Sequence, residues 1–137
     1  MAALQKFNSF AQDLLLARFN FSTHAFRLGL TSTPPSATNT LWTGAGEVTG
    51  TGYTAGGGVL AVTLVPPTGG VSKVTIADYT FTATGTWTAF RYGVIYSNET
   101  ASKYLVGWFD HGASITLSAG ETFKADFDAA NGVFTLA

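Results

Sequence analysis

The 137-residue chain has no cysteine and only two histidines, His24 and His111. The absence of cysteine excludes disulfides, thiolate nucleophiles and cysteine-ligated zinc, so stability has to come from packing. A catalytic serine in a G-x-S-x-G turn is absent as well, because no stretch of the sequence has that pattern. We therefore expect no catalytic residues, no bound cofactor and no enzymatic activity.

Charged side chains are also scarce. They make up 11% of the residues, against roughly a quarter in typical soluble domains. The formal net charge is -1, and the seven lysines and arginines are scattered, which argues against binding to nucleic acid or to an anionic membrane. A surface made mostly of Thr, Ser, Gly and Ala resists aggregation weakly, so we expect part of it to face other subunits.

Long apolar runs are missing too. No apolar stretch reaches the length of a membrane span. The N-terminal segment is interrupted by Lys6, Asp13 and Arg18, whereas a signal peptide has an uninterrupted apolar stretch. We therefore expect a soluble protein that is made in a cytoplasm.

The first segment of the chain has the spacing of a helix. Between Ala3 and Arg18 there is no Gly or Pro, and a three-four spacing predicts a helix with one apolar stripe. The stripe consists of Leu4, Phe7, Ala11, Leu14, Leu15 and Arg18. Phe10 and Leu16 lie off this stripe and form a second apolar flank. We expect this flank to be an interface, either for self-association as a dimer or trimer or for anchoring to a larger assembly.

Most of the remaining chain alternates apolar and polar residues, which is typical of strands. Phe26, Leu28 and Leu30 form one such run. "VLAVTLV" at 59–65 lies between glycines and "PPTGG", and predicts a strand that is buried on both faces. The runs at 90–96 and 104–112 are joined by the polar "SNETASK" and predict an antiparallel hairpin at the centre of the sheet.

The rest of the sequence predicts further short strands. We expect the run "KVTIADYTFTATG" at 73–85 to be strand-like on both sides of a bulge or bend at Ala77-Asp78. Asn131-Gly132 predicts a turn of type I′. Other predicted strand positions are Val74, Ile76, Tyr79, Phe81, Ile115, Leu117, Phe123, Ala125, Phe127 and Val133. The pattern predicts a mainly β protein, an antiparallel β-sandwich or jelly roll with one N-terminal α-helix. We expect a single domain over 1–137, with the helix within 1–19 and the sandwich at 24–137.

A glycine-rich stretch, "TGAGEVTGTGYTAGGG" at 43–58, contains seven glycines. A dinucleotide-binding loop needs G-x-G-x-x-G between a strand and a helix, and a P-loop needs Lys followed by Ser or Thr. Here three residues follow the second glycine, Glu47 would repel a phosphate, and a strand-like run comes next. The stretch therefore predicts a loop that turns corners.

Two groups of polar residues are candidates for chemistry. Asp126 and Asp128 are two residues apart and would share a strand face, where they could hold calcium with help from loop carbonyls. The alternative is a solvated face beside Lys124, and we expect no metal. Asp110 and His111 are neighbours in a strand and project to opposite faces, so they predict a polar cap at the strand end.

The aromatic residues favour packing and contact with partners. Those that face inward would build the core, and those that face outward would line a subunit interface, where Trp and Tyr are enriched. A sugar-stacking platform is the alternative. Trp42 lies alone among polar loop residues and is the best candidate for an interface anchor.

Five segments taken together resemble a known protein family. They are "KFNSFAQDLL", "FRLGLTSTPPSATNT", "EVTGTGYTAGG", "FRYGVIYSNETASKYLVGWFDHG" and "LSAGETFKADFDAANGVFTLA". In this order and spacing they resemble a family of small structural proteins of tailed bacteriophages, and the likeness extends over nearly the whole chain.

The resemblance implies a non-enzymatic virion component similar to head decoration or cement proteins, which fold as β-sandwiches or jelly rolls and clamp neighbouring capsid subunits. The partners would be the major capsid protein and other copies of the chain itself. The location would be the capsid surface, after synthesis in the cytoplasm of a host bacterium. On this basis Glu47 and Tyr53 belong to a shaped loop that touches a partner.

Three alternatives remain open at this point. One is a tail, neck or fibre-associated subunit that binds receptor sugars through exposed aromatics, although the chain has no repeat or coiled-coil stalk. Another is a carbohydrate-binding module derived from a host. The third is a small β-sandwich hydrolase or a metal-dependent lyase, which would need clustered acids and histidines.

Overall fold

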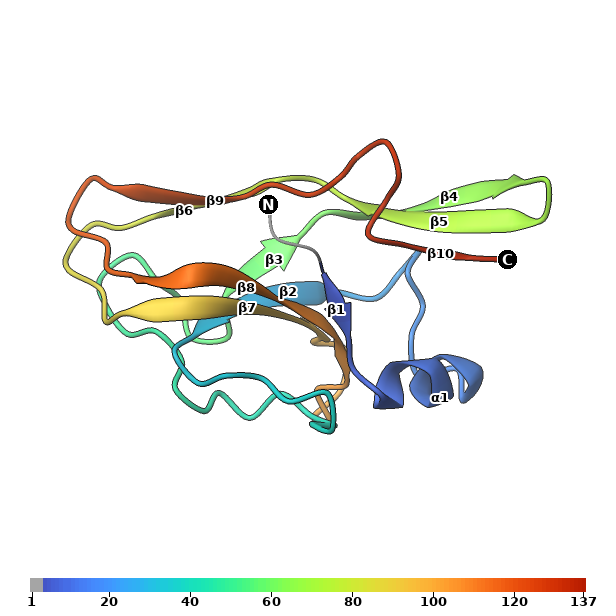
Figure 1. Ribbon diagram of the computed structural model, residues 1–137, viewed down its shortest axis with the longest axis horizontal. Coiled ribbons are helices and arrows are strands. Elements are labelled where there is room, and N and C mark those ends of the chain that lie inside the picture. The colour runs from blue at the N-terminus through green and yellow to red at the C-terminus, as the bar shows by residue number, and fades with distance from the viewer. Residues whose placement is uncertain (1–3) are drawn as a thin grey trace.

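The computed structural model describes residues 4–137 (Figure 1). Within that range the chain forms one helix, α1 (Ser9–Leu15), and ten strands: β1 (Gln5–Lys6), β2 (Phe26–Thr31), β3 (Gly58–Leu60), β4 (Val62–Thr68), β5 (Val71–Ile76), β6 (Tyr79–Thr82), β7 (Phe90–Ser97), β8 (Leu105–Ile115), β9 (Thr122–Ala125) and β10 (Phe134–Leu136). The predicted class, a mainly β protein with antiparallel strands and one helix near the N-terminus, is confirmed.

The largest sheet has the strand order β1-β8-β7-β2-β3, and each neighbouring pair is antiparallel. β2 pairs with β7 along its whole length, from Phe26 opposite Ser97 to Thr31 opposite Tyr92. β7 and β8 form the hairpin that their alternating aromatic residues predict, and it lies at the centre of the sheet. These three strands are the base on which the other elements pack.

Two smaller sheets complete the fold. β6 pairs with β9, and β10, β5 and β4 form a three-stranded sheet. The chain crosses between these two sheets at Ala77-Asp78, where the sequence predicts a bulge or bend. In Figure 1, β6 and β9 lie over the β7–β8 hairpin, whereas the β4–β5 hairpin and β10 extend toward the other end of the molecule, above α1.

The main core lies between the β6–β9 pair and the five-stranded sheet. Trp87 is fully buried there, and its ring centroid lies 6.2 Å from that of Phe81 and 6.5 Å from that of Phe90. Phe123 of β9 meets Phe90 of β7 edge to face at 5.1 Å. Two facing β layers with a shared aromatic core make a sandwich, while the finer jelly-roll order stays a prediction.

A second, smaller core covers the opposite face of the five-stranded sheet. Because neighbouring strand residues alternate between faces, Ile95 belongs to the main core whereas Val94 and Tyr96 belong to the second. Phe7, which follows β1, joins this second core and packs on Trp108 with ring centroids 4.5 Å apart. We call the face that the second core covers the outer face of the sheet.

The predicted helix is shorter than expected. Ala3, its expected first residue, lies outside the described residues, and Gln5–Lys6 pairs with β8 as an edge strand instead of entering the helix. The backbone of this segment gains hydrogen bonds from the sheet edge, so the helix begins only at Ser9. Leu15, expected on the buried stripe, is 88% exposed.

The prediction that Phe10 belongs to an uncovered apolar flank is wrong. Phe10 is only 6% exposed, because its ring packs against Phe19, Phe21 and Phe134 with centroids 5.3, 6.2 and 5.1 Å away. Two of these partners follow the helix directly and the third comes from the last strand. Leu16, in contrast, remains half exposed at the helix end.

One strand prediction and one turn prediction also differ from the structure. The run 59–65 is divided between β3 and β4 at Ala61, and most of its side chains are exposed, because β4 is the edge of a sheet with one covered face. At Asn131-Gly132 only Gly132 has a positive φ, of 80°, so the turn is not type I′. The backbone N–H groups of Ala130 and Asn131 donate instead to the carboxylate of Asp128.

Candidate functional site

Residues 32–57 form a long connection between β2 and β3, and its first part, residues 33–43, covers the outer face of the five-stranded sheet. Two isolated bridges hold it there, one between Thr31 and Glu47 and one between Leu41 and Tyr104. The N–H of Trp42 also donates to the carbonyl of Lys103 at 2.9 Å. In Figure 1 the first part of this connection passes beneath β2, β7 and β8, on the side away from β6 and β9. These backbone contacts fix the position of the loop on the sheet.

Trp42, the predicted interface anchor, is only partly exposed. Its indole lies flat against the ring of Tyr96 and presses on Gly29, a position where a side chain would collide with it. The indole thus belongs to the packing of the outer face, and its remaining surface faces two hollows. The anchoring role of Trp42 toward a partner stays a prediction.

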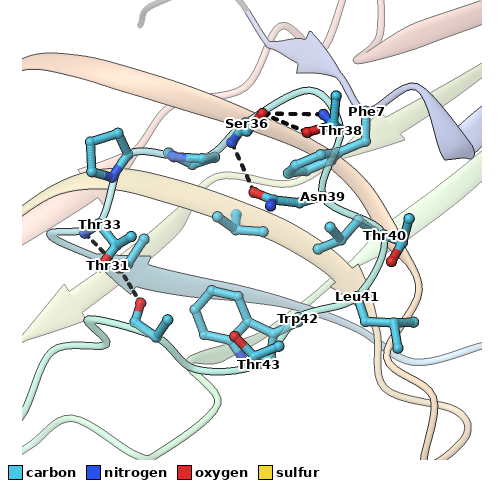
Figure 2. A pocket seen from close by; sticks show the side chains of 15 residues that line it. Phe7, Thr31, Thr33, Ser36, Thr38, Asn39, Thr40, Leu41, Trp42 and Thr43 are labelled. Atoms are coloured by element: carbon cyan, nitrogen blue, oxygen red, sulfur yellow. Dashed lines mark hydrogen bonds between the residues drawn. The ribbon is translucent and has the colours of Figure 1, made fainter.

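The first of these hollows lies between the loop 33–43 and the sheet (Figure 2). We call it the Trp42 hollow, and it has a volume of about 460 Å³. Its lining residues are Phe7, Thr31, Thr33, Pro34, Pro35, Ser36, Thr38, Asn39, Thr40, Leu41, Trp42, Thr43, Ala45, Val94 and Leu105. The lining combines an apolar base from the second core with a rim of hydroxyl and amide groups.

The second hollow, on the other side of Trp42, has charged walls. We call it the charged hollow, and its volume is about 470 Å³. Its charged side chains are Arg27, Glu47 and Lys103. The guanidinium of Arg27 donates to the carbonyl of Gly57 at 3.2 Å, and the ammonium of Lys103 donates to the Asn98 side chain at 2.6 Å. Hydrogen bonds within the chain therefore fix the positions of both cationic groups.

The glycine-rich stretch turns corners, as predicted. Six of its glycines have a positive φ, among them Gly52 at 96° and Gly57 at 88°. The carboxylate of Glu47 accepts a hydrogen bond from the N–H of Gly56 and so ties the two ends of the stretch together. The predicted contact of Glu47 with a partner stays a prediction, because the contacts seen are within the chain.

Tyr53 points into the protein instead of toward a partner. Its hydroxyl accepts a hydrogen bond from the N–H of Leu30 at 3.1 Å, and its ring meets Trp87 edge to face at 5.3 Å. Burial raises the pKa of Tyr53 above its ordinary value, partly offset by the Leu30 hydrogen bond. Tyr53 therefore joins the glycine-rich stretch to the main core, on the side opposite to Trp42.

A third hollow is apolar and lies beside the helix. Its volume is about 320 Å³, and it is lined by Leu14, Phe19, Asn20, Phe21, Leu64, Ser72, Val74, Phe134 and Leu136. Large apolar side chains are also exposed at the end of the helix, which contributes Leu14 to the hollow, and on the three-stranded sheet, which contributes Leu64 and Leu136. We call the four leucines Leu15, Leu16, Leu64 and Leu136 the leucine ledge. An exposed apolar surface of this kind is typical of a binding surface.

The predicted calcium alternative finds no ligand set. Asp126 and Asp128 both follow the end of β9, so they do not share a strand face. The Asp128 carboxylate accepts hydrogen bonds from Ala130, Asn131 and the Asn131 side chain, which hold its pKa below the ordinary value. Within residues 4–137 no three His, Cys, Asp or Glu side chains gather as metal ligands would.

Asp110 and His111 are likewise part of the framework. β8 continues to Ile115, so the pair lies within a strand and not at its end. Asp110 forms a two-pronged ion pair with Arg91 of β7, at 2.7 and 3.0 Å, which lowers the pKa of the carboxyl. The His111 ring packs edge-on to Phe123 at 5.7 Å.

The predicted interface residues thus fall in different places. Trp42 and Glu47 meet at the charged hollow, Leu16 lies on the leucine ledge, and Phe10 and Tyr53 pack inward. The exposed positions of Leu64 and Leu136 were not predicted, although the Pro66-Pro67 pair after Leu64 is a signal for an edge strand, which often has exposed side chains.

Neither a protein-family model, nor a curated protein, nor a solved structure matches this chain significantly. Among residues 4–137, no helix is long and apolar enough to cross a membrane.

Proposed function

We propose that the chain is a structural protein of a tailed-bacteriophage virion, a decoration or cement protein that binds the capsid surface and bridges major capsid subunits. The virion role rests on the resemblance of the sequence to small phage structural proteins, and the leucine ledge is the structural observation that supports docking onto another subunit. Leu64 and Leu136 are 46% and 59% exposed on a sheet that extends away from the main body, next to a hollow with apolar walls. A protein that clamps other subunits needs such a surface.

The energetics fit a docking role. Fully burying an exposed leucine side chain contributes about 1.5–3 kcal/mol, and the three ledge leucines that are already about half buried would each contribute about half of that. A stable interface covers ~800 Å² on each partner, about a ninth of the 6993 Å² of accessible surface here. The contact would therefore extend from the ledge over the neighbouring sheet or helix.

Copy number in purified virions tests the proposal. Quantitative mass spectrometry should give a ratio to the major capsid protein that is near one or a simple fraction of it. A number that fits only a tail or neck ring would instead support the alternative of a tail, neck or fibre-associated subunit. Absence of the chain from purified particles would overturn both.

A binding assay then tests the surface. Leu64→Ser and Leu136→Ser should each weaken binding to capsids that lack the protein by about tenfold or more, because apolar burial is lost. Val59→Ser is the matched control, since Val59 is 56% exposed on β3 of the other sheet. Equal binding by all three variants and the unaltered protein would contradict docking through the ledge.

A further inference from the structure

We propose that the Trp42 hollow is a binding site for a neutral saccharide. The hollow is separate from the leucine ledge and the proposal does not depend on the virion role, because the two surfaces share none of their lining residues. Its volume of about 460 Å³ lies in the range of small-ligand sites, which is roughly 300–1,000 Å³.

The base of the hollow is apolar and largely buried, and its accessible aromatic surface comes from Trp42. Phe7, Val94 and Leu105 belong to the second core, and Trp42 forms one wall beside them. Figure 2 shows the indole at the lower side of the hollow and Phe7 at the upper side. A sugar ring has C–H groups on its faces, and these pack well on an indole. Tyr96 and Gly29 fix the indole before any ligand arrives.

The rim offers hydrogen bonds to hydroxyl groups. Ser36, Thr38, Asn39 and Thr40 follow one another around it. The carbonyl oxygen of the Asn39 side chain accepts from the N–H of Ser36 at 2.8 Å, which fixes the amide and leaves its NH₂ group to donate. The hydroxyls of Ser36 and Thr38 lie 2.9 Å apart. Such a row of polar groups suits a ligand that carries many hydroxyls.

The lining also selects against other ligand classes. No charged residue lines the Trp42 hollow within the described chain, so a phosphate, a carboxylate or a nucleic acid would find no counter-charge there. A peptide that adds as a strand needs a free backbone edge. The backbone at Leu41 and Trp42 is already paired with Tyr104 and Lys103. A neutral saccharide needs neither a counter-charge nor a free backbone edge.

An array experiment tests the ligand class. The full chain is applied to an array that carries neutral oligosaccharides of glucose, galactose and N-acetylglucosamine, together with sialylated glycans, phosphorylated glycans and proline-rich peptides. The expected result is binding to neutral oligosaccharides. Binding only to charged glycans, binding only to peptides, or no binding at all would overturn the proposal.

Titration of a free neutral oligosaccharide that binds on the array then tests whether the Trp42 hollow is the binding site. Asn39→Asp keeps the oxygen that accepts from Ser36 but loses the donating NH₂, and it should weaken binding by about tenfold. Trp42→Phe keeps an aromatic ring on Tyr96 with a smaller face and should weaken binding several-fold. The emission of Trp42 should change on titration, since Trp87 and Trp108 are buried.

A matched control keeps the result interpretable. The Asn20 side chain also fixes a turn, by accepting from the N–H groups of Ser22 and Thr23, and it lies outside the hollow. Asn20→Asp should bind the oligosaccharide as the unaltered chain does. Unchanged binding by both hollow variants, or an equal loss in Asn20→Asp and Asn39→Asp, would overturn the proposal.

Discussion

The indole of Trp42 lies parallel to the ring of Tyr96, with the ring centroids 5.1 Å apart and the planes 7° apart. The same indole presses on Gly29, where an added Cβ would come within 2.7 Å of two ring carbons. Glycine at position 29 therefore leaves the space that the indole fills. A loop residue and two strands meet at this point, and the shape of both neighbouring hollows depends on it.

Gly29→Ala should lower the free energy of unfolding by about 1–3 kcal/mol, because a methyl group inserted into a packed contact forces the indole to move. Urea denaturation of the single variant measures this loss. In a Trp42→Ala background the same change should have little effect, since the colliding ring is gone. An equal loss in both backgrounds would show that the indole does not occupy this space.

Gly52→Val should destabilise the protein more than Gly69→Val does. Both glycines have a positive φ, of 96° and 60°, so both changes carry the left-handed strain of about 1–2 kcal/mol. A Cβ at Gly52 would also lie 2.8 Å from the carbonyl oxygen of Thr82, whereas one at Gly69 would meet no atom within 4 Å. The excess loss should be about 1–3 kcal/mol in thermal or urea unfolding. Equal losses of unfolding free energy in the two variants would contradict a clash at Gly52.

Local patterns in the sequence were enough to predict the strands of the central sheet. The alternation around Phe26 and the two aromatic runs joined by a polar loop predict β2, β7 and β8, because the alternation of side-chain types is a local property of the sequence and β7 and β8 follow one another along the chain. The glycines at 43–58 predict a turning loop, since a positive φ is a local property.

Burial and contacts between distant segments were not predictable in the same way. Whether Phe10 faces solvent depends on Phe134 at the other end of the chain, and whether Leu64 is covered depends on how far the three-stranded sheet projects. Asn131-Gly132 favours a type I′ turn locally, yet the carboxylate of Asp128 accepts from the N–H groups of Ala130 and Asn131, and the N–H of Val133 donates to the carbonyl of Val74 in β5. The Trp42 hollow joins a loop with strands about fifty residues away, and no local pattern specifies it.

High pH should destabilise the protein through its buried tyrosines. Burial raises the pKa of Tyr96 from 10.0 to about 12. The stabilisation from the protonated phenol is therefore complete below pH 10 and is lost as the pH rises toward 12, with a slope of up to about 1.4 kcal/mol per pH unit for one tyrosine. Urea denaturation across this range measures it. Tyr96→Phe should reduce the slope, and an unchanged slope would contradict this origin.

Low pH should destabilise the protein by protonating Asp78, which lies between β5 and β6. The carboxyl accepts from the N–H of Phe127 at 2.8 Å and pairs with Lys124 at 3.1 Å, and both interactions lower its pKa. Its contribution is complete above the ordinary pKa of 3.8 and is lost as the pH falls through the lowered value. Asp78→Asn should show a shallower decrease of the melting temperature in acid. A decrease as steep as in the unaltered chain would rule Asp78 out as its source.

Self-association is best tested at Leu16, because Phe10 and Leu16 differ in burial although only six positions separate them. Phe10→Ala should lower the free energy of unfolding by about 3–5 kcal/mol, since it empties a site among Phe19, Phe21 and Phe134. Leu16→Ser should change it by no more than about 0.5 kcal/mol, because the side chain is half exposed. The two variants thus separate folding from assembly.

If the chain associates through the helix end, Leu16→Ser should reduce the mass measured by light scattering from that of a dimer or trimer toward that of the 14.3 kDa monomer, while the unfolding curve stays the same. Deletion of residues 1–19 is a poorer test, because it also removes β1, Phe7 and Phe10, and loss of the core alone would alter the mass. A monomeric unaltered chain, or a Leu16→Ser variant that keeps the full oligomeric mass, would show that Leu16 does not hold copies of the chain together.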